Sequence, residues 1–246
     1  MINFYLVLFL VTVALFALIT TFSNDIQRIC KFKNHSDIQN IHAGSVPRYG
    51  GVIIFLPLFI STTIINYSDY INSIIFVSFF LVLISALEDL YFDISPLSRL
   101  ISILLIATIF FYNQNIQLPH FNIHILNFEV TSEIFLFFFY VMCVTVMTNG
   151  MNLIDGTNGN SILNFIFFVT ALLIVTNEIN FNQFNIFLVS LLTVSIPFLM
   201  FNFPLGRIFL GDCGAYLLGF VVSLLIIYFY SLNSNLSPYA ALLTIF

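Results

Sequence analysis

The chain has 246 residues, of which 60% are hydrophobic and only 7% are charged, and its mean hydropathy is +1.07. A water-soluble domain carries about 25% charged residues, so this composition argues against a soluble enzyme, a disordered chain or a disulfide scaffold. A net charge of −5 with six Lys and Arg argues against nucleic acid as a partner. We therefore expect an all-α, polytopic helical membrane protein with one integral-membrane domain over residues 1–246.

Apolar runs that approach the roughly 20 residues needed to span a bilayer occur eight times. They are residues 2–22, 50–66, 71–87, 97–112, 132–150, 161–176, 184–201 and 213–231. A ninth run begins near Ala240 and is cut off at Phe246, so we expect the natural chain to be longer and to complete this span. Between the fourth and fifth runs, the alternation of apolar and polar residues near 114–130 predicts a short outer β-hairpin.

The basic residues predict the orientation in the membrane. All six fall in loops that would share one side: Arg28, Lys31, Lys33, Arg48, Arg99 and Arg207. Because cytoplasmic loops are enriched in Lys and Arg, we expect these loops to be cytoplasmic and the N-terminus to lie outside.

Four polar clusters lie at the cytoplasmic ends of the predicted spans. The first, residues 41–51, combines Arg48 with a Pro and a Gly pair. Arg can bind a phosphate through two hydrogen bonds, and Gly allows backbone N–H groups to approach a ligand closely. The alternative is a basic anchor before a helix start. The second cluster contains the adjacent acids Glu88 and Asp89, which suit Mg²⁺ held together with substrate phosphates or simply end a helix.

The third cluster, residues 149–159, packs three Asn, one Asp and three Gly between two spans. Asn side chains offer the paired donors and acceptors that a base or sugar requires, although Gly and Asn also end helices. The fourth cluster, residues 201–214, places Asp212 among glycines at the start of the eighth span. Asp212 either caps that helix or holds a cation beside a pyrophosphate at a helix N-terminus.

The order of these motifs is familiar. HxxxxPRxGG, an acid pair, NxxNxxDGxxG and FNxPxxxIFxGDxG together resemble the polyprenyl-phosphate N-acetylhexosamine-1-phosphate transferases. These enzymes form the MraY–WecA superfamily, glycosyltransferase family 4, and the resemblance covers essentially the whole chain. Two positions depart from the usual pattern: Glu88 and Asn158 stand where many members have Asp.

The resemblance implies roles for individual residues. Asp89 would orient or deprotonate the lipid phosphate, Glu88 and Asp155 would complete the catalytic acids, and Asp212, with Asp155, would bind Mg²⁺ or Mn²⁺. Clusters and resemblance together predict a substrate-binding set made of His42, Arg48, Asn149, Asn152, Gly156, Asn158, Asn202, Phe209 and Gly211.

The resemblance also implies a reaction. A sugar 1-phosphate of the N-acetylhexosamine type would pass from a UDP-sugar to undecaprenyl phosphate with release of UMP. The reaction would start a lipid-linked cell-envelope glycan, such as the O-antigen of lipopolysaccharide, at the cytoplasmic face of the bacterial inner membrane. The partners would be these two substrates and the bilayer, with a homodimer left open.

Two alternatives remain. The first is the phospho-MurNAc-pentapeptide transferase of peptidoglycan synthesis, although residues 42–51 look more like the hexosamine branch. The second is a membrane transporter. Transporters place ionisable groups near the bilayer midplane, whereas the polar clusters of this chain lie at the ends of its spans.

Overall fold

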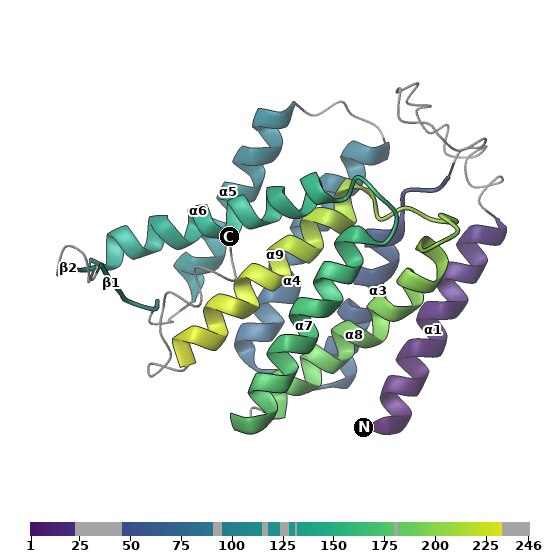
Figure 1. Ribbon diagram of the computed structural model, residues 1–246, viewed down its shortest axis with the longest axis horizontal. Coiled ribbons are helices and arrows are strands. Elements are labelled where there is room, and N and C mark those ends of the chain that lie inside the picture. Colours follow the sequence, from purple (N-terminus) through teal and green to yellow (C-terminus); the bar gives the residue numbers. More distant parts are fainter. Residues whose placement is uncertain are drawn as a thin grey trace.

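The computed structural model describes residues 1–22, 46–90, 95–114, 118–123, 128–130, 132–179 and 182–232. Within these ranges the chain forms a helical bundle with one pair of short strands (Figure 1). The helices are α1 (Ile2–Thr21), α3 (Gly50–Ile64), α4 (Asp69–Leu90), α5 (Pro96–Asn113), α6 (Glu133–Ile154), α7 (Asn160–Ile179), α8 (Asn182–Asn202) and α9 (Gly211–Leu232).

The prediction of a polytopic helical membrane protein is confirmed in its helices. Each apolar run forms one of these helices, with ends shifted by only a few residues. Seven described helices are long and apolar enough to cross a membrane, and α3, with 15 residues, is the shorter eighth. The chain is therefore a multi-pass membrane protein. The ninth run, from Ala240, lies outside the described residues.

Two short strands lie in the segment between α5 and α6. Strand β1 (Phe121–Ile123) pairs antiparallel with β2 (Phe128–Val130), with Asn122 opposite Glu129. This is the region in which alternation predicted a hairpin. The side of the membrane on which it lies stays a prediction.

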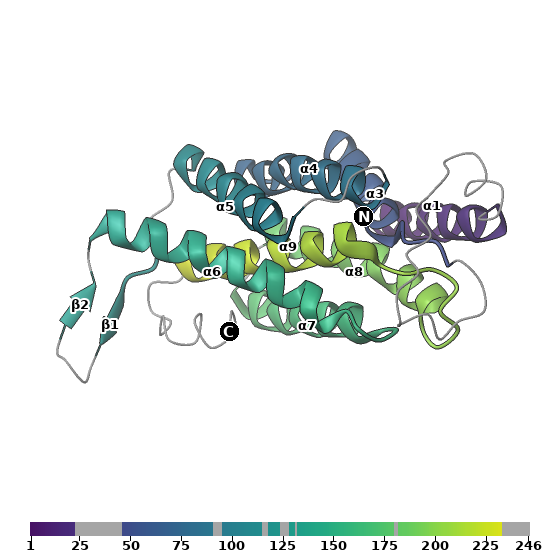
Figure 2. The same ribbon diagram turned by 90° about the horizontal axis from the view of Figure 1, so that it is seen from above.

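Helix α9 forms the centre of the bundle. It packs against α3, α4, α6 and α7, and Figure 2 shows α4 on one side of it and α7 on the other. Its glycines permit this: a Cβ on Gly219 would lie 2.8 Å from the Cα of Thr148 on α6, and a Cβ on Gly51 of α3 would overlap the backbone of Gly214. Small residues allow helices to approach closely where lipid offers no hydrophobic reward for burial.

Successive helices run in alternating directions, and side-chain contacts identify which ends meet. Tyr70 OH donates to the carbonyl of Leu224 (3.2 Å), and Cys213 Sγ donates to that of Val82 (3.7 Å). Helix α4 is thus antiparallel to α9, and Val82, two turns before the end of α4, lies beside the start of α9. We call this end the polar end; it gathers Gly50, Pro96, Ile154, Asn160, Asn202 and Gly211. The far end gathers Asp69, Ile179, Asn182 and Leu232.

Candidate active site at the polar end

Asp212, in the first turn of α9, is the centre of a hydrogen-bonded group. One carboxylate oxygen accepts a bond from Nη1 of Arg99 on α5 (2.8 Å), and the other accepts from Nδ2 of Asn152 on α6 (3.2 Å). The Asp212 side chain remains 38% exposed and that of Arg99 27% exposed. Three helices distant in sequence therefore meet at one carboxylate that is still accessible from the polar end.

Asp155 directly follows α6, and its carboxyl group is close enough to Asp212 and Arg48 to be affected by their charges. Burial raises its pKa from 3.8 to about 6; a hydrogen bond from Ser161 lowers it, the charge of Asp212 raises it, and that of Arg48 lowers it. The charges of Arg48 and Asp212 both affect the pKa of Asp155, so the first, third and fourth clusters lie close together. A proton and a cation would compete for this carboxyl in mildly acidic solution.

Asn202 holds two loops of the site together. Its Oδ1 accepts a hydrogen bond from the N–H of Gly159 (2.6 Å), and its Nδ2 donates to the carbonyl of Ile208 (2.8 Å). The residue is only 4% exposed, so both polar atoms are used inside the protein. Its amide sets the position of the turn after α6 relative to the loop before α9.

The turn after α6 is fixed on one face and open on the other. Asn160 Nδ2 donates to the carbonyl of Ile154 (2.8 Å) and closes the turn. The side chain of Asn158 packs over Gly206, where an added Cβ would lie 2.7 Å from Asn158 Nδ2. In contrast, a Cβ on the exposed Gly156 would meet nothing within 4 Å. A ligand can therefore approach the turn at Gly156.

The glycine pair of the first cluster has a different role from the one predicted. The N–H groups of Gly50 and Gly51 donate to the carbonyls of Phe209 and Leu210 (3.0 Å each), and the N–H of Phe209 donates to Pro47 (2.9 Å). Both glycine N–H groups are thus committed to the loop before α9. The interpretation that they approach a ligand is wrong, because they join α3 to the motif that carries Asp212.

The other predicted residues are placed as follows. Arg48 is exposed, Phe209 is half-buried, Gly211 is the first residue of α9, and Asn149 Nδ2 donates to Thr145 within its own helix (2.8 Å). His42 lies outside the described residues. Glu88 and Asp89 belong to the last turn of α4, so their backbone lies at the polar end, but their side chains are outside the described part.

Sequence reasoning placed Arg99 after the acid pair of the second cluster and among the basic residues, but gave it no role in the site. A signal was present. Arg99 is the only Lys or Arg between Arg48 and Arg207, and it lies in the first turn of α5, where the helix dipole disfavours a cation. A cation in that position needs a specific anionic partner, which here is Asp212.

The donor set fits Mg²⁺. Mg²⁺ prefers oxygen ligands, keeps several waters and commonly uses one or two protein carboxylates together with substrate phosphates. Asp212 and Asp155 supply such carboxylates, and the guanidinium of Arg99 shows that Asp212 attracts a cation. Within the described residues no three His, Cys, Asp or Glu side chains converge, so substrate oxygens and water would complete the coordination.

Comparison with known proteins identifies the family. The profile described as Glycosyl transferase family 4 matches residues 71–230, which include Arg99, Asn152, Asp155, Asn202 and Asp212. The chain belongs to glycosyl transferase family 4. The family assignment confirms the superfamily that the order of the motifs indicated.

A curated relative agrees with the same family. The chain is 25% identical over 229 residues to a phospho-N-acetylmuramoyl-pentapeptide-transferase of Bacillus mycoides (strain KBAB4), a match that covers 87% of this chain and 70% of that protein.

Proposed function

We propose that the protein transfers a sugar 1-phosphate of the N-acetylhexosamine type from a UDP-sugar to undecaprenyl phosphate and releases UMP. The family assignment supports an enzyme that transfers a phospho-sugar to a polyprenyl phosphate. The observation that carries the proposal is the convergence on Asp212 of Arg99 and Asn152, with Asp155 and Arg48 nearby. The site at the polar end therefore combines carboxylates with guanidinium groups.

The reaction joins two anions, so the site must neutralise charge and align the reactants. An oxygen of the lipid phosphate attacks the sugar-side phosphorus of the UDP-sugar, and the bond from that phosphorus to the bridging oxygen breaks as UMP leaves. Arg48 and Arg99 would bind phosphate oxygens, because a guanidinium forms paired hydrogen bonds to them. Asp89 would orient or deprotonate the attacking phosphate, with Glu88 supporting it.

Asp212 and Asp155 would hold Mg²⁺ (or Mn²⁺). When bound, the ion would neutralise the charge of the pyrophosphate oxygens. Asn149, Asn152 and Asn158 would supply hydrogen bonds to the nucleoside or sugar, beside the open face at Gly156 and near Phe209 and Gly211. His42 would complete the substrate-binding set. The internal bonds of Asn202 support a positioning role for it in this set.

Substitution of the central carboxylate tests the proposal. In membranes with matched expression, Asp212→Asn should lower UMP release from UDP-N-acetylglucosamine and undecaprenyl phosphate at least about 10²-fold, because about 2.7 kcal/mol of transition-state stabilisation is lost. Asp89→Asn should do the same. Asp69→Asn is the control, since Asp69 lies at the far end of the bundle and its loss should be silent. Near-normal Mg²⁺-dependent activity of Asp212→Asn would refute the metal assignment.

A second function is favoured by one observation. The relative from Bacillus mycoides is named as a phospho-N-acetylmuramoyl-pentapeptide transferase. The same UMP-release assay separates the two functions when UDP-N-acetylhexosamines and UDP-MurNAc-pentapeptide are supplied in parallel. Turnover of the hexosamine nucleotides supports our proposal and a start of O-antigen or another envelope glycan, whereas turnover of the pentapeptide nucleotide alone replaces it with a role in peptidoglycan synthesis.

We also propose that the polar end faces the cytoplasm of a bacterial inner membrane, with the N-terminus outside. All three described basic side chains, Arg48, Arg99 and Arg207, lie at this end, as the enrichment of cations in cytoplasmic loops requires. A cysteine introduced at Asn158 should resist an impermeant thiol reagent in intact cells, and one introduced at Asn122 should react. The reverse pattern would overturn this orientation.

A further inference from the structure

The guanidinium of Arg99 bonds to two neighbouring side chains of α9. Its Nη1 atom donates to Oδ2 of Asp212 (2.8 Å) and to the hydroxyl of Tyr216 (3.4 Å). Asp212 and Tyr216 are four residues apart in the helix, so their side chains lie one turn apart on the same face. The first bond is a short ion pair, whereas the second is longer than the roughly 2.7–3.2 Å of an ordinary N–H···O bond. Tyr216 is therefore the weaker acceptor of the two in this arrangement.

A cation that binds Asp212 must compete with Arg99. The carboxylate uses Oδ2 for Arg99 and Oδ1 for the Nδ2 atom of Asn152 (3.2 Å). The amide of Asn152 is uncharged, but a guanidinium and a divalent ion at one carboxylate repel each other strongly. Because the Asp212 side chain is 38% exposed, an ion from solvent can reach it. Such an ion binds at the expense of the Arg99 pair.

An Arg99 side chain that leaves Asp212 needs another acceptor. Only 27% of it is exposed, and it lies in the first turn of α5, where the helix dipole disfavours a cation. A guanidinium left without an acceptor in such a place is costly. The hydroxyl of Tyr216 is already within reach of Nη1, and Tyr216 is itself buried. A small movement of Arg99 along α9 would therefore shorten this bond.

We propose that Arg99 and a divalent cation are alternative partners of Asp212, and that Tyr216 is a positioning residue that accepts Arg99 when the cation binds. This inference rests on the proposed function, which assigns Mg²⁺ to Asp212. The exchange would keep the affinity for the free ion low and would release a guanidinium beside the substrate phosphates.

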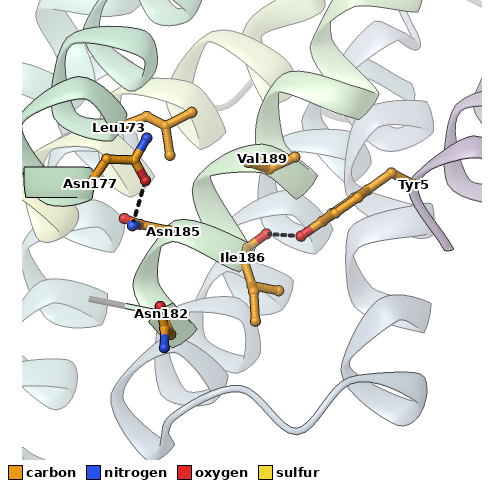
Figure 3. Close-up of a pocket in the computed structure, with 7 residues that line it drawn as sticks. All are labelled: Tyr5, Leu173, Asn177, Asn182, Asn185, Ile186 and Val189. Carbon is orange, nitrogen blue, oxygen red and sulfur yellow. Dashed lines mark hydrogen bonds between the residues drawn. The ribbon is translucent and has the colours of Figure 1, made fainter. Parts of the chain in front are cut away.

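The far end of the bundle offers a matched hydroxyl that has no cation beside it in the described part of the chain. Figure 3 shows Tyr5 pointing to the backbone of Ile186, and its OH donates to the Ile186 carbonyl (3.4 Å). Nearby, Asn185 Nδ2 donates to Oδ1 of Asn177 (2.8 Å). The seven described residues that line the hollow of about 440 Å³ at this point include no Asp, Glu, Lys or Arg. Removal of the Tyr5 hydroxyl is therefore a control that matches removal of the Tyr216 hydroxyl in chemistry but not in place.

Binding of Mn²⁺ to the purified full chain, without substrates, tests the exchange. Mn²⁺ takes the same oxygen ligands as Mg²⁺, and electron paramagnetic resonance measures the ion that stays free. Arg99→Gln removes the competing cation and should tighten Mn²⁺ binding at least about tenfold. Arg207→Gln is the control: it removes an exposed charge at the same end of the bundle, which solvent screens, and should change binding less than about twofold. Unchanged or weaker binding to Arg99→Gln would overturn the exchange.

Removal of one hydroxyl tests the role of Tyr216. Tyr216→Phe should weaken Mn²⁺ binding about fivefold, because Arg99 loses the acceptor that it uses when the ion is bound. Tyr5→Phe should leave binding unchanged. Arg99→Gln combined with Tyr216→Phe should bind Mn²⁺ as tightly as Arg99→Gln alone, since Tyr216 acts through Arg99. No effect of Tyr216→Phe, or an equal weakening in both backgrounds, would overturn the positioning role.

Asp212→Asn separates this inference from the proposed function. If it lowers Mn²⁺ binding while Arg99→Gln does not raise it, the metal assignment stands and only the exchange is wrong. If Asp212→Asn binds Mn²⁺ as the wild type does, the metal assignment fails and the exchange fails with it. Thermal unfolding in detergent confirms that each variant is folded, and the comparison of Tyr216→Phe with Tyr5→Phe decides the outcome if Arg99→Gln does not fold.

Discussion

Helices α1 and α9 are both apolar and long enough to span a membrane, yet they occupy opposite environments. Helix α1 is the more hydrophobic of the two, but only 17% of its most apolar stretch is buried in the protein, against 78% for α9. The more hydrophobic helix therefore lies at the edge of the bundle, as Figure 1 shows. In a bilayer, hydropathy measures how well a helix enters the lipid, and it does not rank helices by their depth in the protein.

The two helices differ in their content of small residues. Helix α9 carries Gly211, Gly214 and Gly219, whereas α1 contains no glycine. Lipid chains are as apolar as leucine, so a helix gains its central position from close van der Waals contact and not from removal of apolar surface from water. Three predictions test this comparison, in order of expected effect.

The largest effect should come from a side chain placed in the closest contact. Gly51→Val forces a branched side chain into the backbone of Gly214 and should destabilise the protein by at least about 3 kcal/mol, the upper range for overpacking. Most of the variant should aggregate in fluorescence-detected size-exclusion chromatography. Ala14→Val on the exposed face of α1 is the control and should elute as wild type; equal behaviour of the two would mean that α3 and α9 are not in close contact.

An intermediate loss of stability should follow the truncation of a leucine on α9, but not of a leucine on α1. Leu224 of α9 is fully buried and Leu10 of α1 is 55% exposed. Leu224→Ala should lower the free energy of unfolding by about 1–2 kcal/mol, less than in a soluble core because lost contacts contribute and transfer from water does not. Leu10→Ala should cost almost nothing. Unfolding curves in mixed micelles provide the measurement, and similar losses for the two would contradict the central position of α9.

The smallest effect concerns the loop that leads into α9. Gly206 has a φ of +58°, and an added Cβ would lie 2.7 Å from Asn158 Nδ2. Gly206→Ala should therefore destabilise the protein by about 1 kcal/mol. Gly156→Ala meets no neighbour, so it should leave the melting temperature unchanged and lower UMP release if the substrate contacts this turn. A Gly206→Ala variant as stable as the wild type would show that the loop accommodates the added methyl group.

Much of the fold was predictable because bilayer thickness imposes a minimum length on apolar runs. All eight runs became helices, and local signals fixed some of their ends. Ser95 Oγ accepts a bond from the N–H of Ser98 (3.2 Å) with Pro96 at the first helical position, and Ser132 caps α6 in the same way.

The candidate site was predictable only in part. The order of the motifs singled out Asp155, Asp212 and Asn152, and the structure brings these three residues together. The role of Arg99 was not predictable from its own segment, since its partner lies 113 residues away. The same limit applies to Asn202 and to the glycine pair, whose hydrogen bonds within the protein join separate loops.

The sequence by itself determined the eight apolar runs that became helices, the family, and the polar residue types that gather at one end of the bundle. These depend on local apolar length and on motifs read along one chain. Only the tertiary structure decided that α9 is central, that Arg99 pairs with Asp212, and that Gly50 and Gly51 bind backbone rather than ligand. The reason is physical: hydropathy along one helix carries no information about its neighbours, whereas helix contacts and ion pairs depend on which surfaces meet in space.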